Sequence, residues 1–532
     1  MTSAPIAAET VVPKPSPIAR GIGFFSGTVG FAIKLVLLGA LNALAVWAIG
    51  VLLADGKWLA ALLIGGAMLL IDVIYLVPDR RLVPLKYLIP GTVFLVAFVL
   101  IPIISNVNIA FTNWSTLHNL TKDEAIVAIE ERSLVAPADA ATYTSTPAKK
   151  DGELVLLLRD DATGDLYVGS KDGLEPLPPG SAQVANGVVT AAEGYEVVKG
   201  NELFTIDAEL NALTIPTGES TFITPEGLSI ANEVQPTLVY DPANDTFKDV
   251  ETGTVYSDNG EGSFESVAGV KLEPGWKTHV GLKNFKTILT DPLVRDPFVR
   301  VFIWTFAFAF LSVLIQFAIG LFLAITLNKP GLKLRRIQRA LLVLPFAIPA
   351  FLSVLVWQGL LNDEFGIVNQ TLNISVPWLT DPTWAKVSCI LVNVWLGFPY
   401  WFLVCTGALL AVPEELTEAA RVDGAGGLQV FRKVTLPLLL VATAPLLIAS
   451  FAFNFNNFNN IYFLTGGGPY EVSQTVAGST DILISYTYKI AFQAGSGAEY
   501  GLAAAVSIFI FFIVAGISAI SFWRTKALEE VR

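Results

Sequence analysis

The feature that most constrains this chain is a set of long apolar runs, each close to the length needed to cross a bilayer. A helix needs about 20 mostly apolar residues to cross roughly 30 Å of hydrocarbon. Eight runs meet this length, near residues 27–53, 58–77, 87–110, 299–327, 339–361, 387–411, 436–459 and 500–523. The composition agrees, since 53% of the residues are hydrophobic and only 15% are charged. The sequence therefore predicts an all-α polytopic membrane protein with about eight transmembrane helices.

The segment between the third and fourth runs differs in kind. Residues 113–297 hold 30 acidic and 13 basic residues, whereas the rest of the chain holds 16 and 21. Short apolar stretches alternate with Gly-Asp, Asp-Gly and Asn-Gly turns, at Leu154–Leu158, Leu166–Val168, Leu203–Ile206 and Thr254–Tyr256. This pattern predicts a β-rich extracytoplasmic domain inserted after the third helix. The residues alone leave two interpretations equally open, a solvated acidic domain and a docking surface for a soluble partner.

The orientation is predicted from lysine and arginine in the short loops. Four basic clusters fall on one side of the membrane if the N-terminus is cytoplasmic: Arg80, Arg81 and Lys86; Lys329, Lys333, Arg335, Arg336 and Arg339; Arg421, Arg432 and Lys433; Arg524, Lys526 and Arg532. The predicted organisation is a cytoplasmic tail (1–23), helices one to three (24–112), the extracytoplasmic insertion (113–297), helices four to eight (298–523) and a cytoplasmic C-terminus (524–532).

The cysteines, histidines and charged residues of the chain argue against several kinds of site. Its two cysteines, Cys389 and Cys405, lie in one apolar run, and its two histidines are far apart, so neither a disulfide framework nor a metal site is expected. No catalytic constellation and no phosphate-binding loop of the Gly-rich Lys-Ser/Thr type is present in the sequence. The interiors of runs four to eight lack Asp, Glu, Lys and Arg, whereas Lys34 and Asp72 lie in the first two runs. A proton relay in the membrane core is therefore not expected.

A polar segment at residues 413–437 separates two of the apolar runs. Pro413 suits a first helical position, and Glu414 and Glu415 suit the positive end of the helix dipole. Leu416, Ala419 and Ala420 share one helix face, and Asp423-Gly424 predicts a turn. The segment therefore predicts a helix–turn–helix between two spans, which is either an amphipathic surface helix or a contact for another protein.

The spacing in this segment resembles the EAA loop of ABC-importer permeases. Glu418, Ala419 and Ala420 are followed by Gly424 and then by Val434-x-Leu436-Pro437, with Val434 where Ile is commoner. The resemblance implies that Glu418, Ala419, Ala420, Gly424, Leu436 and Pro437 couple the chain to a cytoplasmic ATPase subunit. It also implies that ATP and Mg²⁺ bind to that partner and that this chain binds no cofactor directly.

Two polar and aromatic stripes occur inside apolar runs. Asn393, Leu396, Gly397 and Tyr400 repeat at helical spacing in one run, and Ser450, Phe453, Asn454 and Asn457 do so in the next. Amides, hydroxyls and aromatic faces suit a sugar, because they pair with its hydroxyls and pack on its ring. The alternative is helix packing held by Asn and Gly. The lack of Lys and Arg near the stripes favours a neutral solute.

Residues 281–523 resemble the permease subunits of maltose/maltodextrin importers. The matching segments are Gly281–Phe285, Asn393–Tyr400, Ser450–Asn457 and Leu464–Pro469. The resemblance implies that both stripes bind sugar. Leu344–Ala350 matches a segment that carries Tyr and Ser where this chain has Phe346 and Ala350, so two hydroxyls are missing from the implied pocket. That family also carries a large periplasmic insertion after its third span, which favours the docking interpretation of 113–297.

The resemblance implies a transmembrane subunit of an ATP-driven importer for maltose, maltodextrin or a related α-glucoside. It also implies a bacterial inner membrane location, with the 113–297 insertion in the periplasm. The implied partners are a second permease subunit, an ATPase dimer, a periplasmic sugar-binding protein and the membrane lipid, with no nucleic acid. Two other classes remain as alternatives. A secondary transporter needs no partner subunits, and a membrane enzyme or sensor needs a catalytic set or a signalling module.

Overall fold

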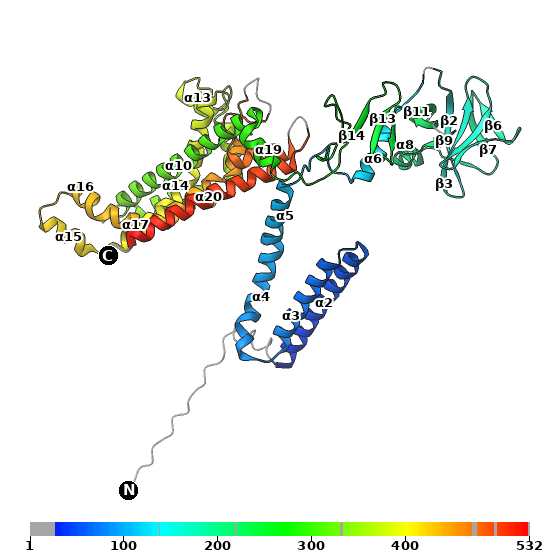
Figure 1. Ribbon diagram of the computed structural model, residues 1–532. Coiled ribbons are helices and arrows are strands. Elements are labelled where there is room, and N and C mark those ends of the chain that lie inside the picture. The colour runs from blue at the N-terminus through cyan, green and yellow to red at the C-terminus, as the bar shows by residue number, and fades with distance from the viewer. Residues whose placement is uncertain are drawn as a thin grey trace, which may run out of the picture. The chain divides into compact units, whose positions relative to one another are not determined.

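The structure is a computed structural model that describes residues 27–137, 139–218, 221–329, 334–470, 476–493 and 497–529. The expected tail at 1–23 and the cluster members Lys333 and Arg532 lie outside these residues. Among the described residues, seven helices are long and apolar enough to cross a membrane, or eight if one bent pair counts as a span. The chain divides into two compact units, residues 1–105 and 106–532, and each is described here by itself (Figure 1).

The first unit contains three apolar helical segments. These are α2 (Gly27–Ala54), α3 (Trp58–Leu76) and a third span built from η1 (Arg80–Leu82), α4 (Val83–Leu95), the π turn η2 (Val96–Leu100) and α5 (Ile101–Ala110), which continues into the second unit. Asn42 on α2 donates a 3.0 Å hydrogen bond to the carboxylate of Asp72 on α3. Asp72 therefore has a polar partner on the neighbouring helix, which a charge within an apolar segment requires.

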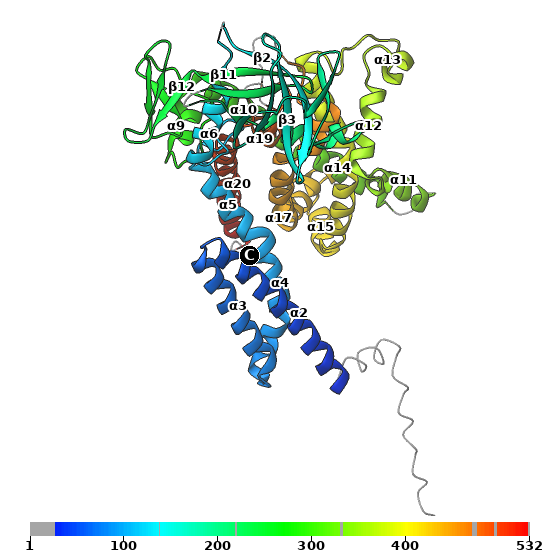
Figure 2. The same ribbon diagram turned by 90° about the vertical axis from the view of Figure 1, so that its right-hand side faces the viewer.

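The second unit contains a helical core. Its elements are α9 (Lys283–Thr290), α10 (Pro292–Leu327), α11 (Arg335–Ala347), α12 (Ala350–Leu360), α13 (Ile367–Leu372), α14 (Pro382–Leu410), α15 (Glu414–Val422), α16 (Gly427–Val430), η3 (Phe431–Thr435), α17 (Leu436–Phe455), α18 (Phe458–Leu464), α19 (Leu483–Phe492) and α20 (Tyr500–Glu529). The long helices α10, α14, α17 and α20 run beside one another (Figures 1 and 2). Gly320 on α10 lies against the backbone of Trp401 on α14, where an added Cβ would stand 2.6 Å from it. This close approach fixes the central helix pair.

The inserted region is β-rich. Its strands are β1 (Leu134–Val135), β2 (Thr142–Lys150), β3 (Glu153–Asp160), β4 (Leu166–Ser170), β5 (Gly173–Pro176), β6 (Ala182–Ala185), β7 (Val188–Ala192), β8 (Glu196–Val197), β9 (Ile215–Pro216), β10 (Phe222–Glu226), β11 (Ile230–Pro236), β12 (Leu238–Asp241), β13 (Thr246–Asp249), β14 (Val255–Asp258) and β15 (Phe264–Ser266). The main sheet has the antiparallel order β5-β4-β3-β2-β11-β10-β9, with β1 on β11 and β8 on β2. A four-stranded sheet (β12 to β15) and the hairpin β6–β7 complete it. The structure confirms the predicted fold class.

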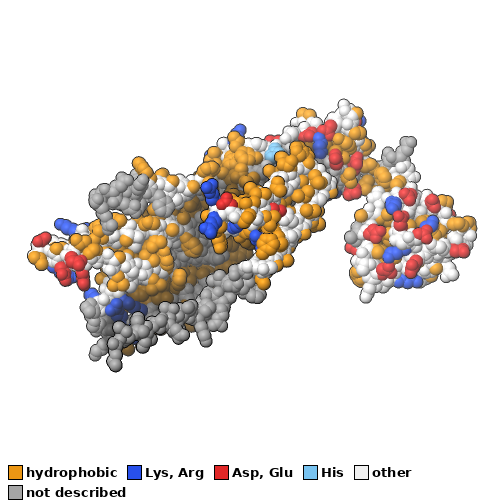
Figure 3. Space-filling model, turned by 90° about the horizontal axis from the view of Figure 1, so that it is seen from below, with side chains coloured by type: hydrophobic (Ala, Val, Ile, Leu, Met, Phe, Trp, Pro, Cys, Tyr) orange, Lys and Arg blue, Asp and Glu red, His pale blue; other side chains and the backbone are white. Residues whose placement is uncertain are grey.

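The central strand β3 explains why its sequence is apolar at successive positions. Leu154, Leu156 and Leu158 pack in one core cluster, and Val155 and Leu157 pack in another. Both faces of β3 are therefore buried, which removes the usual alternation of apolar and polar residues. On the face that Figure 3 shows, charged side chains of both signs are scattered over the β-rich region, whereas the helices are mostly hydrophobic.

The strand predicted at Leu203–Ile206 is wrong. These residues belong to α7 (Glu202–Thr205) and its cap, and α8 (Asp207–Asn211) follows directly. Ile206 and Leu210 are both buried in the domain core. Their spacing of four residues is the helical period, which the short apolar stretch at 203–206 did not reveal by itself.

The fifth predicted span is a bent pair of helices in the structure. α11 and α12 meet at Ile348–Pro349 with a bend of 94°. Ile348 is extended, with φ −89° and ψ 135°. Proline disfavours the helical conformation of the residue before it and donates no backbone hydrogen bond. Pro349 therefore ends α11 and starts α12 in a new direction.

Polar contacts join the base of the β-rich region to the helical core. The Asn113 amide donates to the carbonyls of Glu261 at 2.7 Å and Trp276 at 2.9 Å, and its oxygen accepts from the backbone N–H of Thr278. The Asn284 amide on α9 donates to the carbonyls of Ala110 and Thr112. Each of these amides satisfies two backbone carbonyls where the chain leaves the helical core.

His118 lies at this base between two hydroxyls. Its Nδ1 is 3.0 Å from Ser115 Oγ and its Nε2 is 3.0 Å from Ser263 Oγ. Burial lowers the pKa of His118, and Lys271 and Lys283 lower it further, whereas Glu273 opposes them. The unfolded chain therefore binds a proton more readily than the folded chain does, and stability rises with pH over this range.

We predict that the domain loses stability as the pH falls from about 6.5, the ordinary histidine value, through the lowered pKa of His118. The thermal midpoint of the chain should fall more between neutral and mildly acidic pH than that of His118→Gln. His279→Gln is the matched control and should keep the pH dependence of the parent. Equal pH dependence in the parent and in His118→Gln would contradict the prediction.

Candidate functional site

The two predicted stripes meet in the structure. Asn393 on α14 donates a 2.6 Å hydrogen bond to Asn454 Oδ1 on α17, and Asn457 donates to Asn393 Oδ1 at 3.0 Å. Asn454 also donates to the carbonyl of Ser450 at 2.8 Å. The three amides form one network between helices, and each such bond contributes about 0.6 kcal/mol on average in a membrane protein.

Burial divides the stripe residues into two groups. Asn393 and Asn454 are each only 3% exposed, so their amides serve the network. Phe453 is 72% exposed, and Leu396, Tyr400 and Ser450 are partly exposed. The packing interpretation therefore describes the buried amides, while the aromatic and hydroxyl members of the stripes keep open surface.

Gln316 on α10 leaves no room for a side chain at Gly397. A Cβ at this position would stand 2.3 Å from Cδ of Gln316, whose amide donates to the carbonyl of Asn393 at 2.8 Å. The sequence prediction omitted Gln316. The only sign of its role in the sequence is that it is a polar residue in the middle of an apolar run, and such residues usually face a neighbouring helix. Gln316 and Gly397 together bring α10 and α14 into close contact.

Phe346 and Ala350 flank the break between α11 and α12. Both residues are exposed, and they stand on either side of the extended Ile348. A groove of about 460 Å³ lies elsewhere, beside α19 and α20, and none of the ten predicted sugar-binding residues lines it.

A buried ion pair was missed by the sequence prediction. Lys489 Nζ on α19 donates to Asp481 Oδ2 and to the Tyr470 hydroxyl, each at 2.6 Å. Asp481 also accepts from the backbone N–H of Gly478 and from Ser485 Oγ. Asp481 is fully buried and Lys489 nearly so. The carboxylate is thus satisfied on both oxygens, as a buried charge requires.

The Gly-rich segment Leu464–Pro469 cradles this pair. Gly467 has φ +83°, and an added Cβ would stand 2.0 Å from Asp481 Oδ1 and 2.3 Å from Lys489 Nζ. Only glycine fits both the left-handed backbone and the close approach. The ion pair and its glycine fix the segment between α18 and α19.

The predicted coupling segment forms a projecting helical turn. α15 ends at Val422 with Asp423 as its C-cap, and Gly424 follows with φ +82° in the position that favours glycine. Glu418 and Ala419 are exposed, Ala420 is partly exposed, and the apolar Leu416 is also exposed. The apolar face of α15 therefore has surface free for another protein.

The second helix of this segment continues into the membrane. α16, the π turn η3 and α17 follow without a break, and residues Gly427–Leu464 count as one candidate span. Leu436 and Pro437 begin α17 directly after the π turn η3. The exposed α15 end is thereby connected along one helix to Asn454.

Comparisons with known proteins agree with this geometry. Residues 316–524 match the family described as binding-protein-dependent transport system inner membrane component, and residues 93–172 match the N-terminal region of the transmembrane subunit in PBP-dependent ABC transporters. The maltose/maltodextrin transport system permease protein MalF of Klebsiella aerogenes is 35% identical over 504 residues, which is 92% of this chain and 96% of that protein. The MalF proteins of Salmonella typhimurium and Escherichia coli K12 are also 35% identical, over 93% of this chain and 96% and 97% of theirs.

A multi-pass inner-membrane permease subunit of a binding-protein-dependent ABC importer is the class that these features define. Its members are transport components and not enzymes. Within this class, the chain belongs to the MalF family of maltose/maltodextrin transport system permease proteins.

We predict that Asp481→Asn destabilises the chain strongly. Removing one partner of a buried ion pair leaves the other charge uncompensated, at a cost of about 3–5 kcal/mol. Unfolding of the purified chain in detergent should show this loss, and replacing both Asp481 and Lys489 by leucine should restore much of it. Glu153→Gln is the control, because Glu153 pairs with Lys171 on the exposed surface and should cost at most about 1 kcal/mol. Equal losses in the two single variants would contradict the prediction.

Proposed function

We propose that this chain is the permease subunit of an importer for maltose, maltodextrin or a related α-glucoside. The observation that carries this proposal is the 35% identity to MalF proteins over more than nine-tenths of the chain. The partly exposed Tyr400 and Ser450 and the exposed Phe453 add support, since they offer hydroxyls and rings to a neutral sugar.

The proposed assembly has a second permease subunit, two ATPase subunits and a periplasmic sugar-binding protein. Both termini face the cytoplasm and the β-rich insertion faces the periplasm, as the basic clusters of the short loops favour. The insertion helps a loaded binding protein to dock. ATP and Mg²⁺ bind to the ATPase subunits, and this chain binds neither.

The proposed coupling runs along one helix. Closure of the ATPase subunits moves α15 through its exposed face, which includes Glu418. The movement passes through α16 and η3 into α17, whose Asn454 is hydrogen-bonded to Asn393 on α14. The spans then open the stripes to the outside, and ATP hydrolysis returns them to the inward-facing state.

The test of this function is ATP hydrolysis by the reconstituted assembly. The binding protein would be offered maltose, longer maltodextrins, trehalose, sucrose and a non-sugar control. Stimulation by one or more α-glucosides is expected. A complete assembly that no sugar stimulates would leave the family and the fold standing and would overturn the sugar assignment.

Glu418→Lys should uncouple the ATPase from transport. A reversed charge in a protein contact costs several kcal/mol, so sugar-stimulated hydrolysis should fall by about tenfold or more. Glu364→Lys makes the same change on an exposed loop on the other side of the membrane and should leave stimulation intact. Normal stimulation by Glu418→Lys would remove this residue from the contact.

The double variant Phe346→Tyr, Ala350→Ser should change the sugar preference. It adds two hydroxyls at exposed positions beside the α11–α12 break. One hydrogen bond contributes about 0.5–1.5 kcal/mol, which corresponds to roughly a 2- to 12-fold change in relative stimulation among the sugars. Phe351→Tyr, on the neighbouring exposed ring, is the control. An unchanged profile would show that Phe346 and Ala350 do not contact the sugar.

A further inference from the structure

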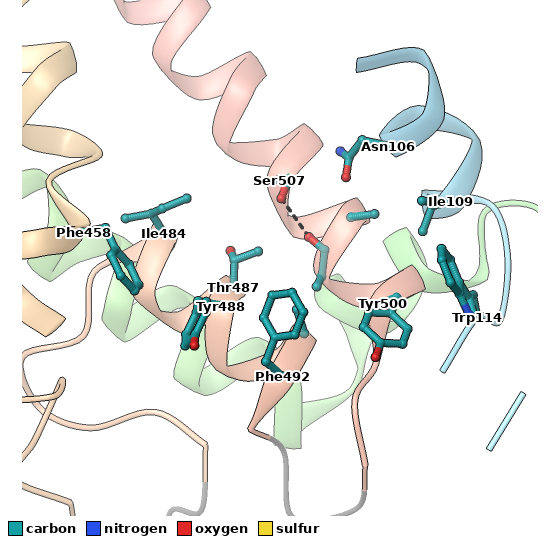
Figure 4. Close-up of a pocket in the computed structure, with 13 residues that line it drawn as sticks. Asn106, Ile109, Trp114, Phe458, Ile484, Thr487, Tyr488, Phe492, Tyr500 and Ser507 are labelled. Carbon is teal, nitrogen blue, oxygen red and sulfur yellow. Dashed lines mark hydrogen bonds between the residues drawn. The ribbon is translucent and has the colours of Figure 1, made fainter. Parts of the chain in front are cut away.

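Two adjoining hollows run along α20 outside the stripes. The first, of about 460 Å³, is lined by α5, α18, α19 and α20 and by Trp114 (Figure 4). The second, of about 320 Å³, is lined mainly by α20 from Ser507 to Ala515. They share Ile484 and Ser507. Together they form one groove beside α20 from Tyr500 to Ala515, which we name the α20 groove.

The wall of the α20 groove is mostly apolar. Ser507 Oγ donates to the carbonyl of Ala503 at 3.0 Å, and Thr487 Oγ donates to the carbonyl of Leu483 at 2.7 Å. Both hydroxyls are thus satisfied within their own helices. The remaining lining is mostly alanine, isoleucine and aromatic rings, together with the amides of Asn106 and Asn456. Asn456 donates to the carbonyl of Ala452 on α17 at 3.2 Å.

One end of the groove lies at the ends of two membrane-spanning segments. The span of α20 starts at Tyr500, and the span that includes α5 ends at Ala110. A row of touching rings crosses this end, with centroids 5.0–6.1 Å apart: Trp114, Tyr500, Phe492, Tyr488 and Phe458 (Figure 4). Trp and Tyr concentrate at the level of the lipid headgroups. The row therefore marks the bilayer surface on the side of the β-rich domain.

A lysine stands at this end of the groove. Lys277 Nζ lies 4.1 Å from the centroid of the Trp114 ring, and its side chain is exposed. Nearby Lys271 and Lys283 pair with Glu265 and Glu261, whereas no ion pair joins Lys277 to any described residue. The partly buried Glu499 precedes Tyr500, and burial raises the pKa of its carboxyl. Lys277 is thus the basic group available to a phosphate at the groove end.

The groove is long enough for one acyl chain. From Tyr500 to Ala515, α20 rises about 22 Å, enough for one leaflet of about 15 Å.

We propose that the α20 groove binds one glycerophospholipid of the leaflet on the side of the β-rich domain. One acyl chain lies against Ala503, Ser507 and Ala515, and the phosphate pairs with Lys277. The lipid stabilises the join between α5, α19 and α20. This proposal depends on the chain spanning a membrane and does not depend on the identity of the sugar.

Photolabelling of the full chain in phosphatidylcholine nanodiscs tests the proposal. The probe is phosphatidylglycerol with a diazirine at the end of one acyl chain, and the comparison probe is a diacylglycerol with the same chain. Mass spectrometry should place the label of the first probe on the residues that line the groove. Labelling spread evenly over all lipid-facing helices would overturn the proposal.

Three variants separate the parts of the site. Ser507→Phe fills the junction of the two hollows and should remove the groove label, whereas Ser518→Phe, three turns further on the same helix face and outside both hollows, should keep it. Lys277→Gln should reduce phosphatidylglycerol labelling to the diacylglycerol level, and Lys248→Gln on the β-rich domain should not. Because Lys277 is on the surface, this test stands even if Ser507→Phe fails to fold. Unchanged labelling in Lys277→Gln would overturn the phosphate contact.

The same labelling in the complete assembly tests the competing occupant. The label should stay on this chain when the partner subunits are present. Loss of the groove label on assembly, with label appearing on a partner helix instead, would make the groove a subunit interface and would overturn the lipid proposal.

Discussion

A side-chain amide within a membrane-spanning helix must find its hydrogen-bond partners inside the protein, because hydrocarbon offers none. Here Asn393 meets this requirement through Asn454 and Asn457, and its backbone carbonyl accepts from Gln316. One residue of α14 thus ties together α10, α17 and the start of α18. The helices beside this network can change their exposed side chains, but they cannot separate here without leaving amides unpaired. The network therefore fixes where α10, α14, α17 and the start of α18 meet.

The rest of the core extends this fixed centre toward two different surfaces. On one side, α17 continues through η3 and α16 to the exposed turn at Gly424. On the other side, the segment after α18 is held by the Asp481–Lys489 pair, which Gly467 admits because it lacks a Cβ. The end at α15 and Gly424 exposes apolar surface, which a surface that docks a partner needs. The end at Asp481 and Lys489 buries an ion pair, which helps a loop to keep one shape.

The sequence predicted the spans well, because their length is a strong physical requirement that about 20 apolar residues reveal directly. It also predicted β3, β4 and β14, where turn residues bound short apolar stretches. It did not predict the bend at Ile348–Pro349, since hydropathy records composition and not direction, although Pro345 and Pro349 were its local signal. Helical spacing showed that Asn393 and Asn454 each belong to a stripe, but not that the two amides bind each other. Asp481 lies in the loop before α19 and Lys489 lies on α19, so helical spacing in the sequence could not predict that they pair.

The amide network is neutral, and this limits how the energy for a conformational change can reach it. Amides do not titrate near neutral pH, so the network cannot respond to a proton, and a mechanical input through α17 is the simplest source. That helix is not uniformly stiff. The π turn at Phe431–Thr435 and Pro445, which leaves the carbonyl of Val441 without its helical donor, both precede Asn454. We expect bending to concentrate between residues 431 and 445, while the part beyond Ser450 stays docked on α14. Movement at α15 would then tilt the lower half of α17 without first breaking the amide network.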